Sequence, residues 1–414
     1  MPMAPKQQAT ASFSLSEFLP GARPGRYEVS ALWEWGDGHR VESNVVEVEL
    51  LPTTARADAW VSRTPGRDDE RWGVWVDVAG DEPQVVRSRL VLGAGGGVRE
   101  TQALWPCSRR ARPMLSTSFP ERPVSGQWVA WIDGGDLLYG WVDGAGQVSK
   151  LRKQALPRDD ALLAAPLHCE ERSAGGDPPV GAALLVMGPP GGAEFGVQAI
   201  ALDKRATAGG LAAARGPRPE HVWSHAFAAN QRWLAMLQQQ GPRMVLLTSP
   251  WPGLRRADIH VVESGVWEGR LLAADAGMLA DGTAGGAALL HVQRGGRNHL
   301  ELVSWSLRSD GSCAPGETFE LAWEWHREIR DARVALRQDG RPGALIRDAV
   351  DGQWWVWDGQ QDPAPVIGEW CRSDQPVRLA FLGGVAEPLV VGGRFEHGWG
   401  VAFPDGRPLP ARSK

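Results

Sequence analysis

Residues 127–142 read Gln-Trp-Val-Ala-Trp-Ile-Asp-Gly-Gly-Asp-Leu-Leu-Tyr-Gly-Trp-Val, which is an apolar run, a short turn and a second apolar run. Asp and Gly at such a turn are typical of a tight β-hairpin. The same pattern surrounds Gly241-Pro242, and it recurs in the segments 71–92, 181–202, 287–306, 333–346 and 377–391. Hairpin units that return about every 50 residues predict a repeat architecture.

Short, evenly spaced strands with Gly-rich turns are typical of a β-propeller, in which each repeat forms one four-stranded sheet. Prolines mark the unit boundaries, because proline cannot donate to a central strand and belongs at strand ends. Pro52, Pro106 and Pro157 are 54 and 51 residues apart, and the series continues to Pro410. We therefore expect an all-β protein, a β-propeller of seven blades of about 50 residues. Six or eight blades remain alternatives.

The chain resembles the β-propeller class broadly, as a divergent member without a specific family. Trp357-Asp358 matches the Trp-Asp dipeptide of WD40 repeats, but it is the only one in the chain and lacks the accompanying Gly-His. The 21 tryptophans against 2 tyrosines are interpreted mainly as large rings that fill the space between blades.

The first 51 residues do not follow the repeat. Residues 13–18, 26–35 and 41–50 have strand-like patterns, and residues 27, 29, 31, 33 and 35 form one apolar face. Residues 24–29 and 43–48 resemble the last strands of bacterial immunoglobulin-like domains, although a full sandwich needs about 100 residues. We expect a disordered terminus at 1–12, a β-appendage at 13–51, the propeller at 52–410 and a tail at 411–414. In the alternative, the strand at 45–50 pairs into the last blade and closes the ring.

Composition limits the class of protein. Hydrophobic residues make up 43% and charged residues 22%, as in a soluble globular protein. The net charge of −5 argues against a general nucleic-acid-binding role, which requires a basic surface. The sequence has no long apolar span and no apolar leader, so we expect no membrane contact and a cytoplasmic location. Four cysteines lie far apart without a CxxC motif, which indicates neither a zinc site nor a disulfide framework.

The sequence predicts no catalytic residues, no metal site and no cofactor. His221 and His225 have an i,i+4 spacing, but the segment is strand-like, whereas a histidine metal pair at this spacing requires a helix. The clustered aspartates Asp133, Asp136 and Asp143 adjoin Gly-containing turns, where Asp has a local structural role. Hydrolase, calcium-loop and phosphate-loop motifs are missing from the sequence.

One pair of segments indicates a binding role. Trp105-Pro106-Cys107-Ser108-Arg109-Arg110 reappears 146 residues later as Trp251-Pro252-Gly253-Leu254-Arg255-Arg256. Arginine is enriched at interfaces and suits carboxylate or phosphate partners. We therefore predict partner-binding roles for Trp105, Arg109, Arg110, Trp251, Arg255 and Arg256, with both Arg pairs on one rim. In the alternative, each arginine pairs with an acid of a neighbouring blade.

These observations favour a non-enzymatic scaffold for protein–protein interaction. It would be a subunit of a cytoplasmic bacterial multiprotein system, for example an ATPase-linked or defence-related one. Loops on a rigid framework are where binding concentrates. The first alternative is an enzyme or small-ligand binder that uses the central channel, and the second is a glycan-binding propeller. Fold alone does not decide among them.

Overall fold

The structure is a computed structural model of the full chain. It describes residues 25–35, 39–50, 60–63, 70–77, 82–91, 97–108, 111, 113–116, 126–156, 162–170, 180–188, 194–202, 208–215, 218–227, 231–250, 261–279, 281–322, 329–337, 339–349, 352–367, 377–381, 388–394 and 398–405. Every element within these ranges is a β-strand, which confirms the all-β prediction. The chain divides into unit 1, Met1–Thr54, and unit 2, Ala55–Lys414. The segments predicted as a disordered terminus and a tail, 1–12 and 411–414, lie outside the described residues.

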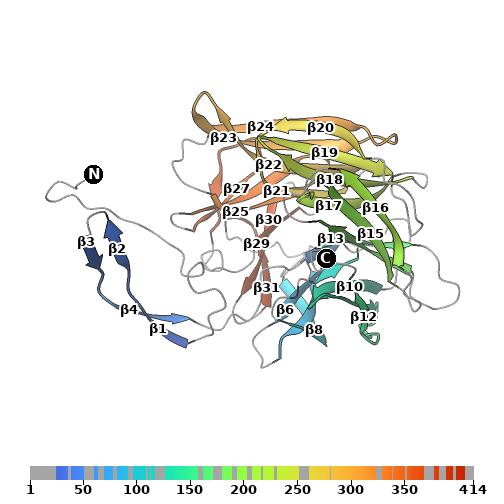
Figure 1. The fold of residues 1–414 in the computed structure, drawn as a ribbon, viewed down its shortest axis with the longest axis horizontal. Coiled ribbons are helices and arrows are strands. Elements are labelled where there is room, and N and C mark those ends of the chain that lie inside the picture. The colour runs from blue at the N-terminus through green and yellow to red at the C-terminus, as the bar shows by residue number, and fades with distance from the viewer. Residues whose placement is uncertain are drawn as a thin grey trace, which may run out of the picture. The chain divides into compact units, whose positions relative to one another are not determined.

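Unit 2 is a succession of antiparallel sheets, six of four strands and one of three within the described residues, with the strands of each sheet in chain order (Figure 1). The first sheet comprises β5 (Trp60–Arg63), β6 (Glu70–Asp77), β7 (Gln84–Val91) and β8 (Gly97–Pro106). The second comprises β9 (Met114–Leu115), β10 (Gly126–Asp133), β11 (Asp136–Asp143) and β12 (Arg152–Ala155). The third comprises β13 (Leu162–Glu170), β14 (Val180–Met187), β15 (Glu194–Leu202) and β16 (Ala208–Arg215).

The later sheets repeat this plan. The fourth comprises β17 (His221–Phe227), β18 (Gln231–Gln240), β19 (Arg243–Pro250) and β20 (Val262–Glu268). The fifth comprises β21 (Arg270–Met278), β22 (Ala284–Arg294), β23 (Arg297–Leu307) and β24 (Cys313–Ala322). The sixth comprises β25 (Ile329–Leu336), β26 (Pro342–Asp348), β27 (Trp354–Trp357) and β28 (Ala364–Pro365). The last comprises β29 (Val377–Phe381), β30 (Pro388–Arg394) and β31 (Gly398–Ala402).

The first strands of successive sheets lie next to one another. β9 contacts β13, β13 contacts β17, and the series continues through β21 and β25 to β29. β31 of the last sheet contacts β8 of the first. Radially repeated sheets whose inner strands adjoin are the arrangement of a β-propeller, which is the fold of unit 2.

The hairpin at residues 127–142 forms as the sequence predicts. Asp133 is paired with Asp136 across a two-residue turn. The two turn residues, Gly134 and Gly135, have φ angles of 59° and 86°. Positive φ at both central positions defines the type I′ turn, whose twist matches that of the flanking strands.

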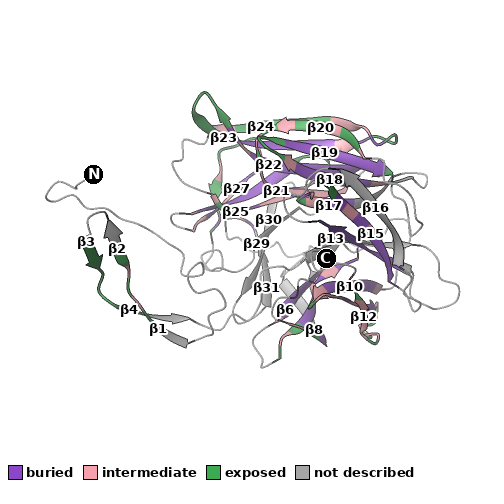
Figure 2. Cartoon of the chain, viewed as in Figure 1, coloured by how far each residue is buried: buried purple, intermediate pink, exposed green. Residues whose placement is uncertain are grey.

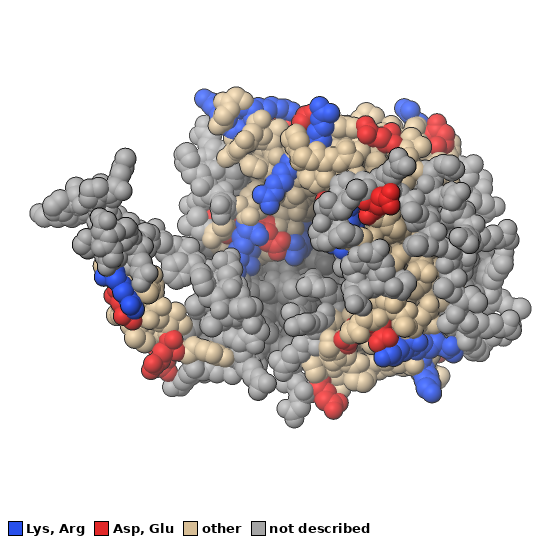
Figure 3. All heavy atoms as spheres, in the orientation of Figure 1, with Lys and Arg blue, Asp and Glu red and all other residues tan. Residues whose placement is uncertain are grey.

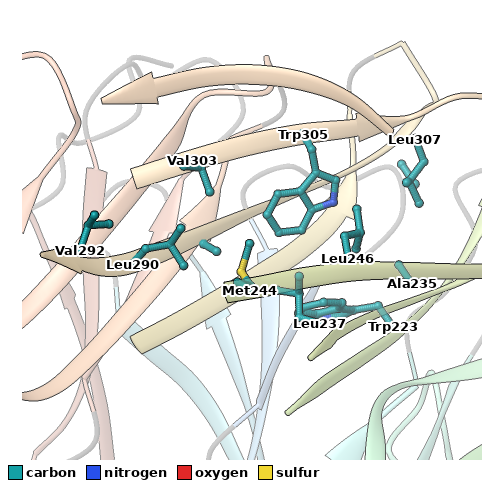
Figure 4. Packing of buried hydrophobic residues seen from close by; sticks show 12 residues of the cluster. Trp223, Ala235, Leu237, Met244, Leu246, Leu290, Val292, Val303, Trp305 and Leu307 are labelled. Atoms are coloured by element: carbon teal, nitrogen blue, oxygen red, sulfur yellow. The ribbon is translucent and has the colours of Figure 1, made fainter. Parts of the chain in front are cut away.

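The hydrophobic core is divided into clusters that lie between neighbouring sheets. Alternate residues of one strand contribute to different clusters: Trp128 and Ala130 of β10 pack with residues of the third sheet, whereas Val129 and Trp131 pack with residues of the first. Both faces of a middle strand are therefore buried, which explains its continuous apolar run (Figure 2). Figure 4 shows the cluster between the fourth and fifth sheets, where Met244 and Leu246 of β19 face Trp305 of β23.

Glycines allow aromatic rings to pack closely between sheets. A methyl group at Gly140 of β11 would overlap the ring of Trp105, which belongs to the preceding sheet. The same relation holds for three other pairs of a glycine and an aromatic ring in the preceding sheet: Gly181 with Trp128, Gly311 with Trp233, and Gly359 with Phe319. The interpretation of tryptophans as filling between blades is confirmed for these described rings.

Unit 1 contains a long hairpin, which we call the arm (residues 25–50). Limb 1 of the arm (residues 25–35) carries β1 (Gly25–Val29) and β2 (Leu32–Trp35), and limb 2 (residues 39–50) carries β3 (His39–Glu42) and β4 (Val46–Leu50). β1 pairs with β4 and β2 pairs with β3, both antiparallel. The appendage predicted at residues 13–51 falls within this unit.

Candidate partner-binding site

The structure describes one of the six residues that the sequence selected for partner binding. Trp105 lies at the end of β8. Its side chain is only 7% exposed and packs against Trp131, with ring centroids 5.9 Å apart. Its indole Nε1 donates to the carbonyl of Ser149 at 3.2 Å. Trp105 therefore holds the first two sheets together. Arg109, Arg110, Trp251, Arg255 and Arg256 lie outside the described residues.

The backbone on both sides of the first Arg pair is fastened to the propeller. The N–H of Cys107 donates to the carbonyl of Pro83 at 2.9 Å. The N–H of Ser108 donates to Asp133 Oδ2 at 2.9 Å. Ala111, which is 3% exposed, donates its N–H to the carbonyl of Ser108 at 3.2 Å, and this bond spans positions 109–110. Ala111 also packs in the hydrophobic cluster between the first two sheets, so the described residues on both sides of positions 109–110 are held to the propeller.

Cys107 adds no nucleophile to this connection. Burial, and secondarily the negative charge of Asp133, raise the pKa of the Cys107 thiol to about 12. Because the thiolate is the reactive form of cysteine, this thiol stays protonated and inert at neutral pH.

The strand order separates the two Trp-Pro segments, contrary to the expectation of a common rim. The first segment follows β8, the fourth strand of its sheet, whereas the second follows β19, the third strand of its sheet. Successive antiparallel strands run in opposite directions, and the inner strands of a propeller run the same way around the ring. The two connections therefore leave their sheets at opposite rims.

The arm carries a feature that sequence reasoning missed, namely an apolar face open to solvent. In the β1–β4 ladder, Val29 is opposite Val46, and in the β2–β3 ladder, Val41 is opposite Trp33. Val41 and Val46 are 54% and 52% exposed. Figure 2 shows exposed residues along β3 and β4. The alternation was visible in the sequence, but the exposure of this face is a property of the tertiary structure.

A bulge keeps the arm's apolar residues in phase. Val41 and Val46 are five positions apart, which in a regular strand would place them on opposite faces. The pairing register shifts by one residue between Val29–Val46 and Leu32–Glu42, so limb 2 has one extra residue here. The extra residue moves the side chains of limb 2 beyond the bulge to the other face. Val46 is opposite Val29, and Val41 is opposite Trp33, which is four positions from Val29 on the regular limb 1. Both valines therefore lie on the face that contains Val29.

Charged groups elsewhere form structural networks. On the fifth sheet, Arg294 Nη2 lies 2.5 Å from Glu301 Oε1, and its Nη1 lies 3.2 Å from Glu320 Oε2. His299 Nδ1 lies 2.9 Å from Glu320 Oε1. Burial raises the pKa of Glu301, and Arg294 opposes that shift. On the face in Figure 3, basic and acidic residues are interspersed.

The described residues contain no group of three or more His, Cys, Asp or Glu side chains placed to hold a metal ion. His221 lies on β17, stacked on Trp223 at a centroid distance of 5.4 Å and an angle of 4°. Burial lowers the pKa of His221 to about 4, so the ring is neutral at physiological pH. Its role in the structure is packing.

Comparisons with known proteins assign the chain to no family, but they find solved structures with a similar fold. No family model matches the chain, and no curated protein matches it. Among solved structures, hydrazine synthase of Kuenenia stuttgartiensis is similar at 10% identity with a TM-score of 0.42, covering 84% of this chain and 95% of that one. The N10 neuraminidase-like protein of A/little yellow-shouldered bat/Guatemala/060/2010 is similar at 11% identity with a TM-score of 0.36, covering 73% and 94%. At these TM-scores, neither similarity carries an argument about activity.

No helix in the described ranges is long and apolar enough to cross a membrane.

Proposed function

We propose that this protein is a non-enzymatic scaffold for protein–protein interaction, in which a rigid propeller carries a docking arm. The observation that supports the proposal best is the solvent-exposed apolar face of the arm, with Val41 and Val46 more than half exposed. Exposed apolar patches on soluble proteins mark interaction sites. A two-stranded hairpin is marginally stable alone in water. A partner sheet or surface that covers the apolar face therefore stabilises the arm at the same time as it binds.

Burying the exposed halves of Val41 and Val46 contributes roughly 1 kcal/mol each, at about 25 cal/mol per Å². The Arg pairs at 109–110 and 255–256 remain proposed contacts. The strands that precede them, β8 and β19, end at opposite rims, so we propose that the two pairs make separate contacts.

The scaffold proposal includes a ring of seven blades and a location in a cytoplasmic bacterial multiprotein system. Three observations support the blade number: the proline spacing, the seven consecutive sheets, and the contact of β31 with β8. The location is proposed together with the scaffold role, and fractionation of the native host, with the protein followed by antibody, tests it.

The test is affinity purification of the full chain from its native host, beside a Val41→Glu/Val46→Glu variant. Two buried carboxylates and the lost apolar contact weaken docking at least thirtyfold, which corresponds to about 2 kcal/mol. We expect a stoichiometric partner of the wild type to be lost. The matched control is Glu28→Gln/Glu47→Gln, which changes the opposite face of the same ladder and should retain the partner.

Two results contradict the proposal. One is a partner that the apolar variant retains as well as the wild type does, because the arm is then not the docking element. The other is a purified protein without any partner but with a stoichiometric metal or small molecule, which indicates a ligand-binding channel. A parallel Arg109→Ala/Arg110→Ala/Arg255→Ala/Arg256→Ala variant tests whether the Arg pairs contribute.

A further inference from the structure

The two outer edges of the arm differ in how well they are protected against strand pairing. Limb 2 carries the bulge at residues 43–45. Bulges are one means by which edge strands avoid pairing. Limb 1 has no bulge within its 11 residues, 25–35. Among the described residues, limb 1 is therefore the edge that is open to another strand.

The backbone of limb 1 points hydrogen-bonding groups toward that edge. The Ala31 N–H donates to Ser43 Oγ at 2.8 Å, and the Ala31 carbonyl accepts from the Ser43 N–H at 2.8 Å. Both polar groups of Ala31 thus point toward limb 2. Because this direction alternates along a strand, the N–H and carbonyl of Ser30 point to the outer edge.

The sequence of limb 1 is complementary to itself in an antiparallel register. With a two-fold axis at Ser30, Arg26 of one copy lies opposite Glu34 of the other, and Tyr27 lies opposite Trp33. Opposite charges and aromatic pairs stabilise neighbouring strands. The same operation on β4, centred on Val48, sets Glu47 opposite Glu49, and like charges in that position are destabilising.

We propose that limb 1 pairs with limb 1 of a second copy of this chain, and that the two arms form one four-stranded sheet with Ser30 on the two-fold axis. The bulge at residues 43–45 lies across from Ser30 and Ala31 in each arm, so the two-fold axis places the two bulges symmetrically on either side of it. The combined sheet doubles the apolar face that carries Val41 and Val46. This inference rests on the proposed function and extends it, because it makes the scaffold a dimer whose two arms share one enlarged docking face.

The test is sedimentation of the full chain over a concentration series, which should give twice the 44.8 kDa chain mass at high concentration. Arg26→Glu and Glu34→Arg each place like charges together in both symmetry-related pairs, which should raise the dimer Kd about tenfold. Each change also alters a pair inside the arm, where Arg26 is opposite Glu49 and Glu34 is opposite Arg40. The fourfold exchange Arg26→Glu/Glu34→Arg/Arg40→Glu/Glu49→Arg keeps opposite charges in every one of these pairs and should restore the dimer. Glu47→Arg on limb 2 is the matched control and should leave the Kd unchanged.

A Ser30→Cys variant locates the axis. In a hydrogen-bonded antiparallel pair the two Cα atoms are about 5.5 Å apart, within disulfide range, so mild oxidation should crosslink this variant into a dimer. Glu47→Cys and the wild type should stay uncrosslinked.

Specific results overturn the pairing. One is a protein that stays monomeric at all concentrations. Another is a fourfold charge exchange that fails to restore the dimer. A third is a crosslink at position 47 in place of position 30. These outcomes are separable from failure of the scaffold function. If sedimentation shows only a monomer but the Val41→Glu/Val46→Glu variant still loses its protein partner, only the dimer proposal is overturned. If sedimentation shows the dimer but that variant retains the partner, only the scaffold proposal is overturned.

Discussion

At the scale of single residues, His221 illustrates how burial changes a side chain's role. Its spacing to His225 would suit a metal pair on a helix, but the segment is predicted as a strand, and the structure places it on strand β17, where the two histidines are not one helical turn apart. Burial holds the His221 ring in its neutral form, stacked on Trp223.

His221 should make stability depend on pH. Its pKa falls from 6.5 in the unfolded chain to about 4 in the folded protein, so the unfolded state binds more protons between these values. The free energy of unfolding therefore falls as pH drops from 6.5 toward 4, by on the order of 3 kcal/mol. A His221→Phe variant keeps a ring beside Trp223 and removes the proton.

The measurement is urea unfolding at pH 7 and pH 4.5 for both proteins. The difference between them isolates His221, because Glu301 and the other acids titrate equally in each. Equal losses of stability in the wild type and the variant would contradict the assignment.

At the scale of elements, close contacts between an aromatic ring and a glycine connect adjacent sheets. The sequence displays many tryptophans and glycines, but it does not say which ring meets which glycine. Trp105 and Gly140 are 35 positions apart and belong to different sheets. Only the packing of the first sheet against the second brings them together.

Gly140→Ala should lower the free energy of unfolding by about 1–3 kcal/mol, because the added methyl group overlaps the Trp105 ring and overpacking carries this cost. The matched control is Gly277→Ala on β21, where an added Cβ meets nothing within 4 Å. The control should change the free energy by less than about 0.5 kcal/mol. Chemical unfolding measures both, and an equal effect of the two changes would refute the packing argument.

At the scale of the whole molecule, the apolar clusters lie in unit 2, each between two neighbouring sheets. These clusters supply the hydrophobic stabilisation of the propeller. The arm supports no comparable cluster among its described residues.

The fragment 55–414 should therefore fold without unit 1. We expect a β-type circular dichroism spectrum and a cooperative thermal transition within a few degrees of that of the full chain, because the sheet-to-sheet cores are retained. The control is the full chain carrying Val41→Glu/Val46→Glu, which should melt at the wild-type temperature. An aggregated fragment, or one without a cooperative transition, would show that unit 1 contributes to the propeller's stability.

The sequence by itself determined the all-β class, the repeat and the hairpin at residues 127–142, because those depend on local periodicity and turn chemistry that residue types carry directly. The tertiary structure decided three further points. It buried Trp105, it placed the connections that carry the two Trp-Pro segments at opposite rims, and it left the apolar face of the arm exposed. Each depends on contacts or strand directions between residues distant in the chain, and alternation of residue types does not reveal what covers a face.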